Sequence, residues 1–152
     1  MPMETSENLQ GGCLCGAVRY AIELNCLPPV YVCHCLDCQT WSGSAFSIQC
    51  VMPEDVLDVA GDLEIYEWKT PTGHRSLQRF CVHCHARIYN TNSLRPGIAV
   101  LRAGTLARRD LVEVVGHIWT KRKQPWIAIP DSVPSWPESA PTADFVALVM
   151  PR

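Results

Sequence analysis

Seven of the nine cysteines lie in three tight clusters, and clustered thiols are the groups in this sequence best suited to bind metal or react. The clusters are Cys13-Leu14-Cys15, Cys33-His34-Cys35-Leu36-Asp37-Cys38 and Cys81-Val82-His83-Cys84. The two pairs can together supply the four ligands of one closed tetrahedral zinc site. The three-cysteine cluster supplies only three ligands and leaves a fourth position open. The sequence therefore predicts two zinc ions, one in a closed site and one in an open site.

Local geometry supports this grouping. Side chains at i and i+2 of an extended backbone leave the same face, and a Cys-x-x-Cys knuckle brings two sulfurs toward one ion. The alternative is that the cysteines are small buried hydrophobic residues, but burial gives no reason for clustering. Cys26, Cys50 or His34 could complete the three-cysteine cluster and make it a structural site. The His34 side chain should leave the opposite face from its neighbours, so an open site is favoured.

The charge of an open three-thiolate site indicates which chemistry it favours. Three thiolates around Zn²⁺ leave one net negative charge, so the ion is a weak Lewis acid and a poor activator of carbonyl groups. A substrate thiol in the fourth position would lose its proton and become a nucleophile for an electrophile such as an aldehyde. Cys33, Cys35 and Cys38 thus form a candidate catalytic centre for thiol addition.

Hydrophobic periodicity predicts a mainly β chain. Short apolar or alternating runs mark candidate strands at 16–24, 45–51, 63–68, 75–80, 87–90, 98–102 and 111–119. Frequent Gly, Pro and Asp residues between them are typical of an antiparallel meander. Helix signals are weak. One short helix is expected from Cys35 to Trp41, ending at Gly43, and another from an N-cap at Thr142 to Met150.

Length and composition indicate one domain. The chain has 152 residues, 47% of them hydrophobic and 18% charged. We expect a flexible N-terminus at 1–10 and one zinc-binding domain at 11–152, whose proline-rich end at 125–152 wraps over the sheet. A formal net charge of −2 argues against nucleic acid as the main partner. No secretory signal or membrane-spanning stretch is apparent, so we expect no membrane association and a cytoplasmic location, where thiols stay reduced.

The order and spacing of the clusters resemble the glutathione-dependent formaldehyde-activating (GFA) family, a group of zinc-binding proteins related to carbon–sulfur lyases. The matching segments are Gly11–Tyr20, Cys33–Cys38, Ser42–Phe46, Arg79–Cys84 and His117–Trp126. The resemblance implies a β-tent of coiled antiparallel sheets with little helix. It also implies a structural zinc held by Cys13, Cys15, Cys81 and Cys84, and a catalytic zinc held by Cys33, Cys35 and Cys38. Glutathione and formaldehyde are the substrates it implies.

Four other histidines are interpreted without a metal-binding or catalytic role. His85 stands where the family usually has glycine, so it either takes a left-handed backbone conformation or marks a changed turn. His83 and His85 are expected to be exposed knuckle residues rather than zinc ligands. His74 is interpreted as a surface loop residue, with a proton shuttle as the alternative, and His117 as a hydrogen-bonded packing residue.

Candidate substrate contacts follow the three-cysteine cluster and lie near the C-terminal end. Ser42, Gly43 and Ser44 offer N–H groups and hydroxyls for a carboxylate or aldehyde oxygen, or they simply end the short helix. Trp126 is expected to wall the pocket together with Trp41 and Trp119, with ordinary packing as the alternative for each.

The sequence therefore predicts a carbon–sulfur lyase-type zinc enzyme that forms or cleaves an adduct between a thiol and a small aldehyde. A non-catalytic, zinc-stabilised protein-interaction module is the main alternative, and a fourth protein ligand at the three-cysteine site would favour it. A thiol redox sensor is a further alternative, and it predicts a reversible disulfide within that cluster.

Overall fold

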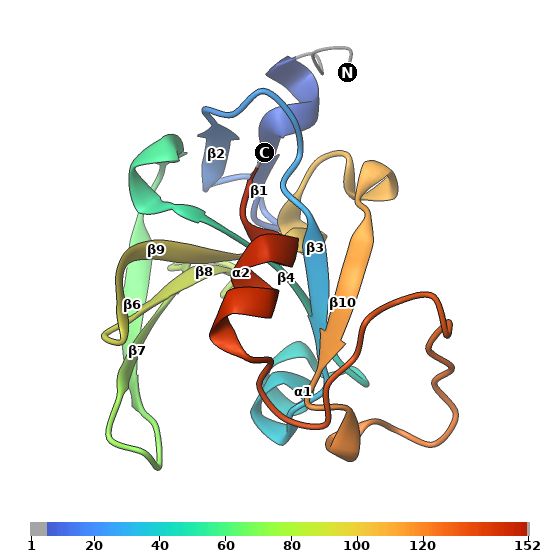
Figure 1. Cartoon of the computed structure of the whole chain (residues 1–152). Coiled ribbons are helices and arrows are strands. Elements are labelled where there is room, and N and C mark those ends of the chain that lie inside the picture. The colour runs from blue at the N-terminus through green and yellow to red at the C-terminus, as the bar shows by residue number, and fades with distance from the viewer. Residues whose placement is uncertain (1–5, 152) are drawn as a thin grey trace.

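The computed structural model describes residues 6–151 and confirms a mainly β architecture (Figure 1). The strands are β1 (Gln10–Gly12), β2 (Arg19–Ile22), β3 (Val30–Cys33), β4 (Ser47–Pro53), β5 (Leu57–Ala60), β6 (Leu63–Lys69), β7 (Arg75–Cys81), β8 (Arg87–Asn92), β9 (Arg95–Arg102) and β10 (Val114–Ile118). The helices are α1 (Leu36–Ser42) and α2 (Thr142–Val149). Short 3-10 helices, η1 to η5, cover Ser6–Leu9, Glu54–Val56, Ala103–Thr105, Arg109–Leu111 and Thr120–Arg122.

The strands form two sheets. The smaller sheet has the order β1-β2-β5, and the larger has the order β10-β3-β4-β9-β8-β7-β6. Strands β6 to β9 follow one another as an antiparallel meander, as the frequent turns predict. The pairing of β10 with β3 is parallel, which the sequence did not indicate. The chain leaves β9, which lies beside β4, and returns as β10 at the outer edge of β3.

Three strands escaped sequence analysis, one because it lacks the alternation of a half-buried strand and two because they are short. All four residues of β3 are buried, so Val30–Cys33 reads as a continuous apolar run. Strand β1 has only three residues and β5 only four. Tertiary pairing rather than local pattern therefore defines these strands.

The main core fills the space between the two sheets, and a second cluster lies beneath α2. In Figure 1, α2 crosses one face of the larger sheet. Phe145 of α2 packs edge-on against Tyr31 of β3, with 4.8 Å between ring centroids. Val149 and Val51 belong to the same cluster. This contact holds α2 against β3, the strand that ends at Cys33.

Both helices lie close to their expected positions. Helix α1 ends at Gly43, whose φ of 61° is the left-handed conformation that glycine adopts at little cost. The expected N-cap at Thr142 is wrong by one residue. Pro141 occupies that position, because its carbonyl accepts the hydrogen bond from the Phe145 N–H at 3.0 Å.

Segments near the two limits of the described residues pack against different parts of the fold. Of the segment expected to be flexible, residues 1–5 lie outside the described residues, η1 covers Ser6–Leu9, and Leu9 is buried in the core. Near the other end, the irregular segment before α2 runs beside β10. There the N–H groups of Trp136 and His117 donate to the carbonyls of His117 and Pro134, at 2.9 and 3.0 Å. Among residues 6–151, no helix is long and apolar enough to cross a bilayer.

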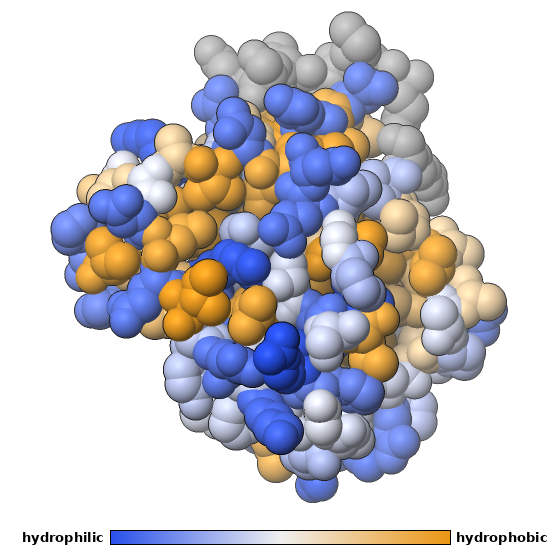
Figure 2. Space-filling model, turned by 90° about the vertical axis from the view of Figure 1, so that its left-hand side faces the viewer, coloured by the Kyte–Doolittle hydropathy of each residue, from blue (hydrophilic) through white to orange (hydrophobic). Residues whose placement is uncertain are grey.

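Strand β6 forms the free edge of the larger sheet. Figure 2 shows the face that lies on the left in Figure 1, where hydrophobic residues form patches separated by hydrophilic ones. Ile65 and Tyr66 of β6 are exposed. The charged residues Glu64, Glu67 and Lys69 share this strand, and charges of this kind discourage pairing with another chain.

Gly61 allows the loop before β2 to approach the turn between β5 and β6. Its φ is 110°, and an added Cβ would collide with the carbonyl oxygen of Ala17 and lie 2.9 Å from the Cα of Val18. Val18 in turn bonds Cys13: the Cys13 N–H donates to the Val18 carbonyl at 3.0 Å, and the Val18 N–H donates to Cys13 Sγ at 3.2 Å. A side chain at position 61 would therefore disturb the cysteine loop.

Gly61→Ala is expected to lower the free energy of unfolding by about 3 kcal/mol or more, because backbone strain adds to a collision with main-chain atoms. Gly73→Ala is the matched control. Gly73 also has a positive φ, of 87°, but open space surrounds its added Cβ, so strain alone should cost about 1–2 kcal/mol. Urea unfolding followed by circular dichroism measures both. Equal losses in the two variants would contradict a close approach at Gly61.

Candidate metal centres and substrate cleft

The structure brings the seven clustered cysteines into two groups that could hold a metal ion. The four-cysteine centre contains Cys13, Cys15, Cys81 and Cys84, and the three-cysteine centre contains Cys33, Cys35 and Cys38. Within each group the sulfur atoms lie within 4.8 Å of one another. No histidine or carboxylate of residues 6–151 joins either group. The first centre is therefore complete with four sulfurs, and the second offers three.

Sulfur spacing in the four-cysteine centre fits a tetrahedral metal. The Sγ atoms of Cys13 and Cys15 are 3.6 Å apart, and those of Cys15 and Cys81 are 3.8 Å apart. Zinc–sulfur bonds of about 2.3 Å at tetrahedral angles require sulfur–sulfur distances of roughly 3.8 Å. The loop after β1 and the turn after β7 thus present a ligand set of the right size.

The backbone of the Cys81–Cys84 turn points N–H groups at sulfur. The His83 N–H donates to Cys81 Sγ at 3.4 Å, and the Ala86 N–H lowers the pKa of Cys84 to about 6. His85 has a φ of 62°, so it adopts the left-handed conformation and the turn is retained without glycine. These N–H donors stabilise the thiolate form of the cysteines. The thiolate is the form that binds a metal cation, so the turn favours metal binding.

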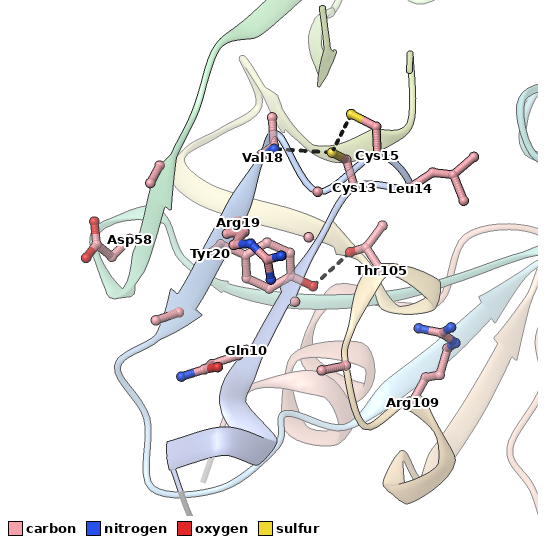
Figure 3. Close-up of a pocket in the computed structure, with 16 residues that line it drawn as sticks. Gln10, Cys13, Leu14, Cys15, Val18, Arg19, Tyr20, Asp58, Thr105 and Arg109 are labelled. Atoms are coloured by element: carbon pink, nitrogen blue, oxygen red, sulfur yellow. Dashed lines mark hydrogen bonds between the residues drawn. The ribbon is translucent and has the colours of Figure 1, made fainter. Parts of the chain in front are cut away.

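A broad hollow of about 700 Å³ lies beside the four-cysteine centre (Figure 3). Cys13 and Cys15 lie at one end of it, and Arg19 and Arg109 also line it. The Tyr20 hydroxyl reaches across to the Thr105 hydroxyl at 2.8 Å. This bond links the smaller sheet to η3, and both residues line the hollow.

The three-cysteine centre forms where β3 passes into α1. Cys33 is the last residue of β3, Cys35 is the N-cap of α1, and Cys38 lies in the first turn of that helix. The Cys38 N–H donates to Cys35 Sγ at 3.3 Å, so the cap itself turns this sulfur toward its neighbour. Figure 1 shows α1 and β1 at opposite ends of the molecule, which separates the two centres.

The three thiols of this centre oppose one another's ionisation. Hydrogen bonds with Cys33 and Cys38 lower the pKa of Cys35 to about 3. The same contacts with Cys35 and Cys38, together with burial, raise the pKa of Cys33. Hydrogen bonding among the thiols therefore favours ionisation of Cys35 over that of Cys33. A metal ion would remove this competition by stabilising all three thiolates.

His34 is turned away from the sulfurs, as its position between two ligands predicts. Its Nε2 lies 2.9 Å from Nδ1 of His117 on β10, and the two rings stack. Burial lowers the pKa of His34 to about 4, so the neutral form is kept at neutral pH. The pair joins β3 to β10, which agrees with the packing role expected for His117.

A cleft of about 350 Å³ opens beside the three-cysteine centre. Cys35 and Cys38 lie in its wall, and Trp41, Trp68 and Trp119 supply much of its apolar surface. Trp41 and Trp68 meet edge to face, with 5.9 Å between ring centroids. The larger sheet forms the floor. A small ligand in this cleft would lie next to two of the three sulfurs.

A polar network on the sheet floor was missed by sequence analysis. The Tyr31 hydroxyl donates to Gln49 Oε1 at 2.7 Å, and Gln49 Nε2 donates to Cys38 Sγ at 3.4 Å. Nearby, Arg102 Nη2 donates to Asn90 Oδ1 at 2.7 Å and to Gln78 Oε1 at 3.3 Å. The signal in the sequence was polar residues within candidate strands. Gln49, Gln78 and Asn90 are such residues, and all three are buried in the structure.

The structure separates the residues proposed as substrate contacts. Ser42 and Ser44 line a second hollow next to the cleft, and Gly43 forms the cap of α1 between them. The Ser44 N–H donates to Ser42 Oγ at 3.1 Å, so these residues do end the helix. Trp126 is 74% exposed and is not in the wall of either cavity. His74, by contrast, does line the cleft.

Comparison with known proteins agrees with this arrangement. The sequence model of the family described as "Glutathione-dependent formaldehyde-activating enzyme" matches residues 8–122. A crystal structure of a Rhodobacter sphaeroides protein is 27% identical and superposes with a TM-score of 0.54, covering 69% of this chain and 96% of that one. No curated protein matches the chain. Because the family match includes both cysteine centres and spans most of the sequence, the chain belongs to the glutathione-dependent formaldehyde-activating family.

Proposed function

We propose that this protein binds glutathione at a zinc ion and adds it reversibly to formaldehyde or a related small aldehyde. Three convergent sulfurs, with no fourth ligand from residues 6–151 and a cleft at their side, support the proposal most directly. Family membership supports the choice of glutathione and formaldehyde. A cytoplasmic location is part of the proposal, because the thiols must stay reduced.

The cysteine sets fit zinc in number and donor type. Cys13, Cys15, Cys81 and Cys84 would hold a structural ion, and Cys33, Cys35 and Cys38 a catalytic one. Zinc bound at the three-cysteine centre would lower the pKa of a thiol that takes its fourth coordination position. The amide of Gln49 donates to Cys38 Sγ and thereby stabilises the negative charge on that ligand.

The cleft would orient the reactants and exclude water. The bond that forms joins the thiol sulfur to the aldehyde carbon, while the C=O π electrons move to oxygen. The thiol proton is released to solvent, and the oxygen takes one proton up, so atoms and charge balance. The indoles of Trp41 and Trp68 form an apolar wall that would keep the small aldehyde close to sulfur.

Catalysis is tested with the zinc-loaded protein in a mixture of glutathione and formaldehyde. We expect the protein to accelerate interconversion of glutathione and S-hydroxymethylglutathione, measured by NMR exchange spectroscopy. In the cobalt-substituted protein, glutathione should change the visible absorption of the metal, because its sulfur joins the coordination sphere, whereas S-methylglutathione should not. Unchanged exchange rates and an unchanged cobalt spectrum would refute the proposed function.

Cys35→Ser is expected to reduce the zinc content from two ions to one and to lower the exchange rate by at least about 100-fold, since it removes a direct ligand. The secondary structure should persist, because the four-cysteine centre is untouched. Cys26→Ser is the control, since Cys26 lies outside both centres. Metal analysis, circular dichroism and the exchange assay measure the three effects. A variant that keeps two ions would show that Cys35 is not a ligand.

Cys84→Ser should also remove one ion, but it should reduce the stability of the fold more than Cys35→Ser does. Structural zinc binding contributes on the order of 10 kcal/mol to the folding of small zinc domains, so this variant should be destabilised by several kcal/mol. Thermal unfolding of Cys84→Ser and Cys35→Ser at equal protein concentration provides the comparison. If Cys35→Ser is the less stable of the two, the assignment of structural and catalytic centres must be reversed.

A further inference from the structure

A second hollow of about 340 Å³ adjoins the cleft and contains two arginine side chains. We call it the arginine hollow; its main lining residues are Trp41, Ser42, Ser44, Phe46, Arg87 and Arg102. Trp41 and Arg102 line the cleft as well. A ligand that places one group at the three-cysteine centre could therefore place another group in the arginine hollow.

The guanidinium groups retain buried nitrogen atoms without a partner among residues 6–151. These atoms are Nη1 of Arg87 and Nε and Nη1 of Arg102. None of the ion pairs within residues 6–151 includes either arginine. Burial, followed by the charge of Arg102, lowers the pKa of Arg87 to about 9, which reflects the cost of holding two cations in one wall. Unpartnered charged donors of this kind favour an anionic ligand.

The cysteine centre compensates only part of this positive charge. Three thiolates with Zn²⁺ carry one net negative charge, and the two guanidiniums carry two positive charges. Among the described residues 6–151, no aspartate or glutamate lines the arginine hollow. Arg87 lies over the Trp41 ring at 4.6 Å from its centroid, a contact that fixes the guanidinium plane without using its N–H groups. An anion with two acceptor oxygens matches such a planar donor.

We propose that the arginine hollow binds a carboxylate of the thiol substrate while its sulfur occupies the three-cysteine centre. This inference rests on the proposed function, and glutathione carries carboxylates at both ends. Ser42 and Ser44 at the rim add hydroxyl groups near the site. The hollow thus selects carboxylate-bearing thiols over neutral ones, because only the former pair with the uncompensated guanidinium.

Thiol selectivity provides the first test, using zinc-loaded protein and its cobalt-substituted form. Arg87→Gln should weaken glutathione binding about tenfold or more but leave 2-mercaptoethanol binding unchanged, because only glutathione has a carboxylate. Arg79→Gln is the matched control. Arg79 also lies over an aromatic ring, that of Tyr89 at 4.8 Å, but it lines neither cavity. An equal loss for both thiols in Arg87→Gln would overturn the inference.

A second measurement needs no variant and no reaction at the metal. N-acetylglycine carries the carboxylate alone, and N-acetylglycinamide is its neutral counterpart. N-acetylglycine should shift the side-chain Nε–H resonance of Arg102 in zinc-loaded protein, and the amide should not. If this shift occurs while glutathione leaves the cobalt spectrum unchanged, the carboxylate site stands and the proposed function fails. If glutathione reaches the metal but N-acetylglycine causes no shift, the function stands and the carboxylate site is refuted.

Discussion

Sulfur atoms held within a few ångströms of one another favour a positive charge among them, and this fold brings seven sulfurs into two such groups. Neighbouring thiolates repel one another, and burial opposes the ionisation of a thiol. A bound cation would offset both effects. The four-cysteine centre joins the loop after β1 to the turn after β7 and thereby links the two sheets. The three-cysteine centre joins β3 to α1. The sulfurs converge because cysteines stand at the ends of β3 and β7 and at the N-cap of α1.

The face of the larger sheet next to the three-cysteine centre departs from ordinary core packing. Gln49, Gln78 and Asn90 are buried there, and Arg102 donates to two of them. Buried polar groups reduce stability unless each finds a partner, and part of the Arg102 guanidinium finds none within residues 6–151. Local conflicts of this kind are expected where a protein binds a ligand. The polar floor, the tryptophans and the three-cysteine centre thus lie around one cleft.

Sequence analysis recognised each cysteine cluster because the spacing within a cluster is local, and the structure brings the two separate pairs together. The grouping of Cys13 and Cys15 with Cys81 and Cys84 is confirmed, as are the helix end at Gly43 and the left-handed alternative for His85. Features that depend on long-range pairing were not predictable in the same way. The parallel edge strand β10, the fully buried β3 and the convergence of Gln49, Gln78 and Arg102 arise only when distant strands are aligned. Substrate contacts at Ser42, Gly43, Ser44 and Trp126 remain predictions.

The separation of ligands along the chain has a consequence for biosynthesis. Cys33, Cys35 and Cys38 leave the ribosome almost together, whereas Cys15 and Cys81 are 66 residues apart. A nascent chain therefore carries a complete set of three neighbouring thiols long before the other set can assemble. The two pairs of the four-cysteine centre can meet only after most strands of the larger sheet have been synthesised. The direction of translation thus gives the smaller centre the earlier opportunity to capture an ion.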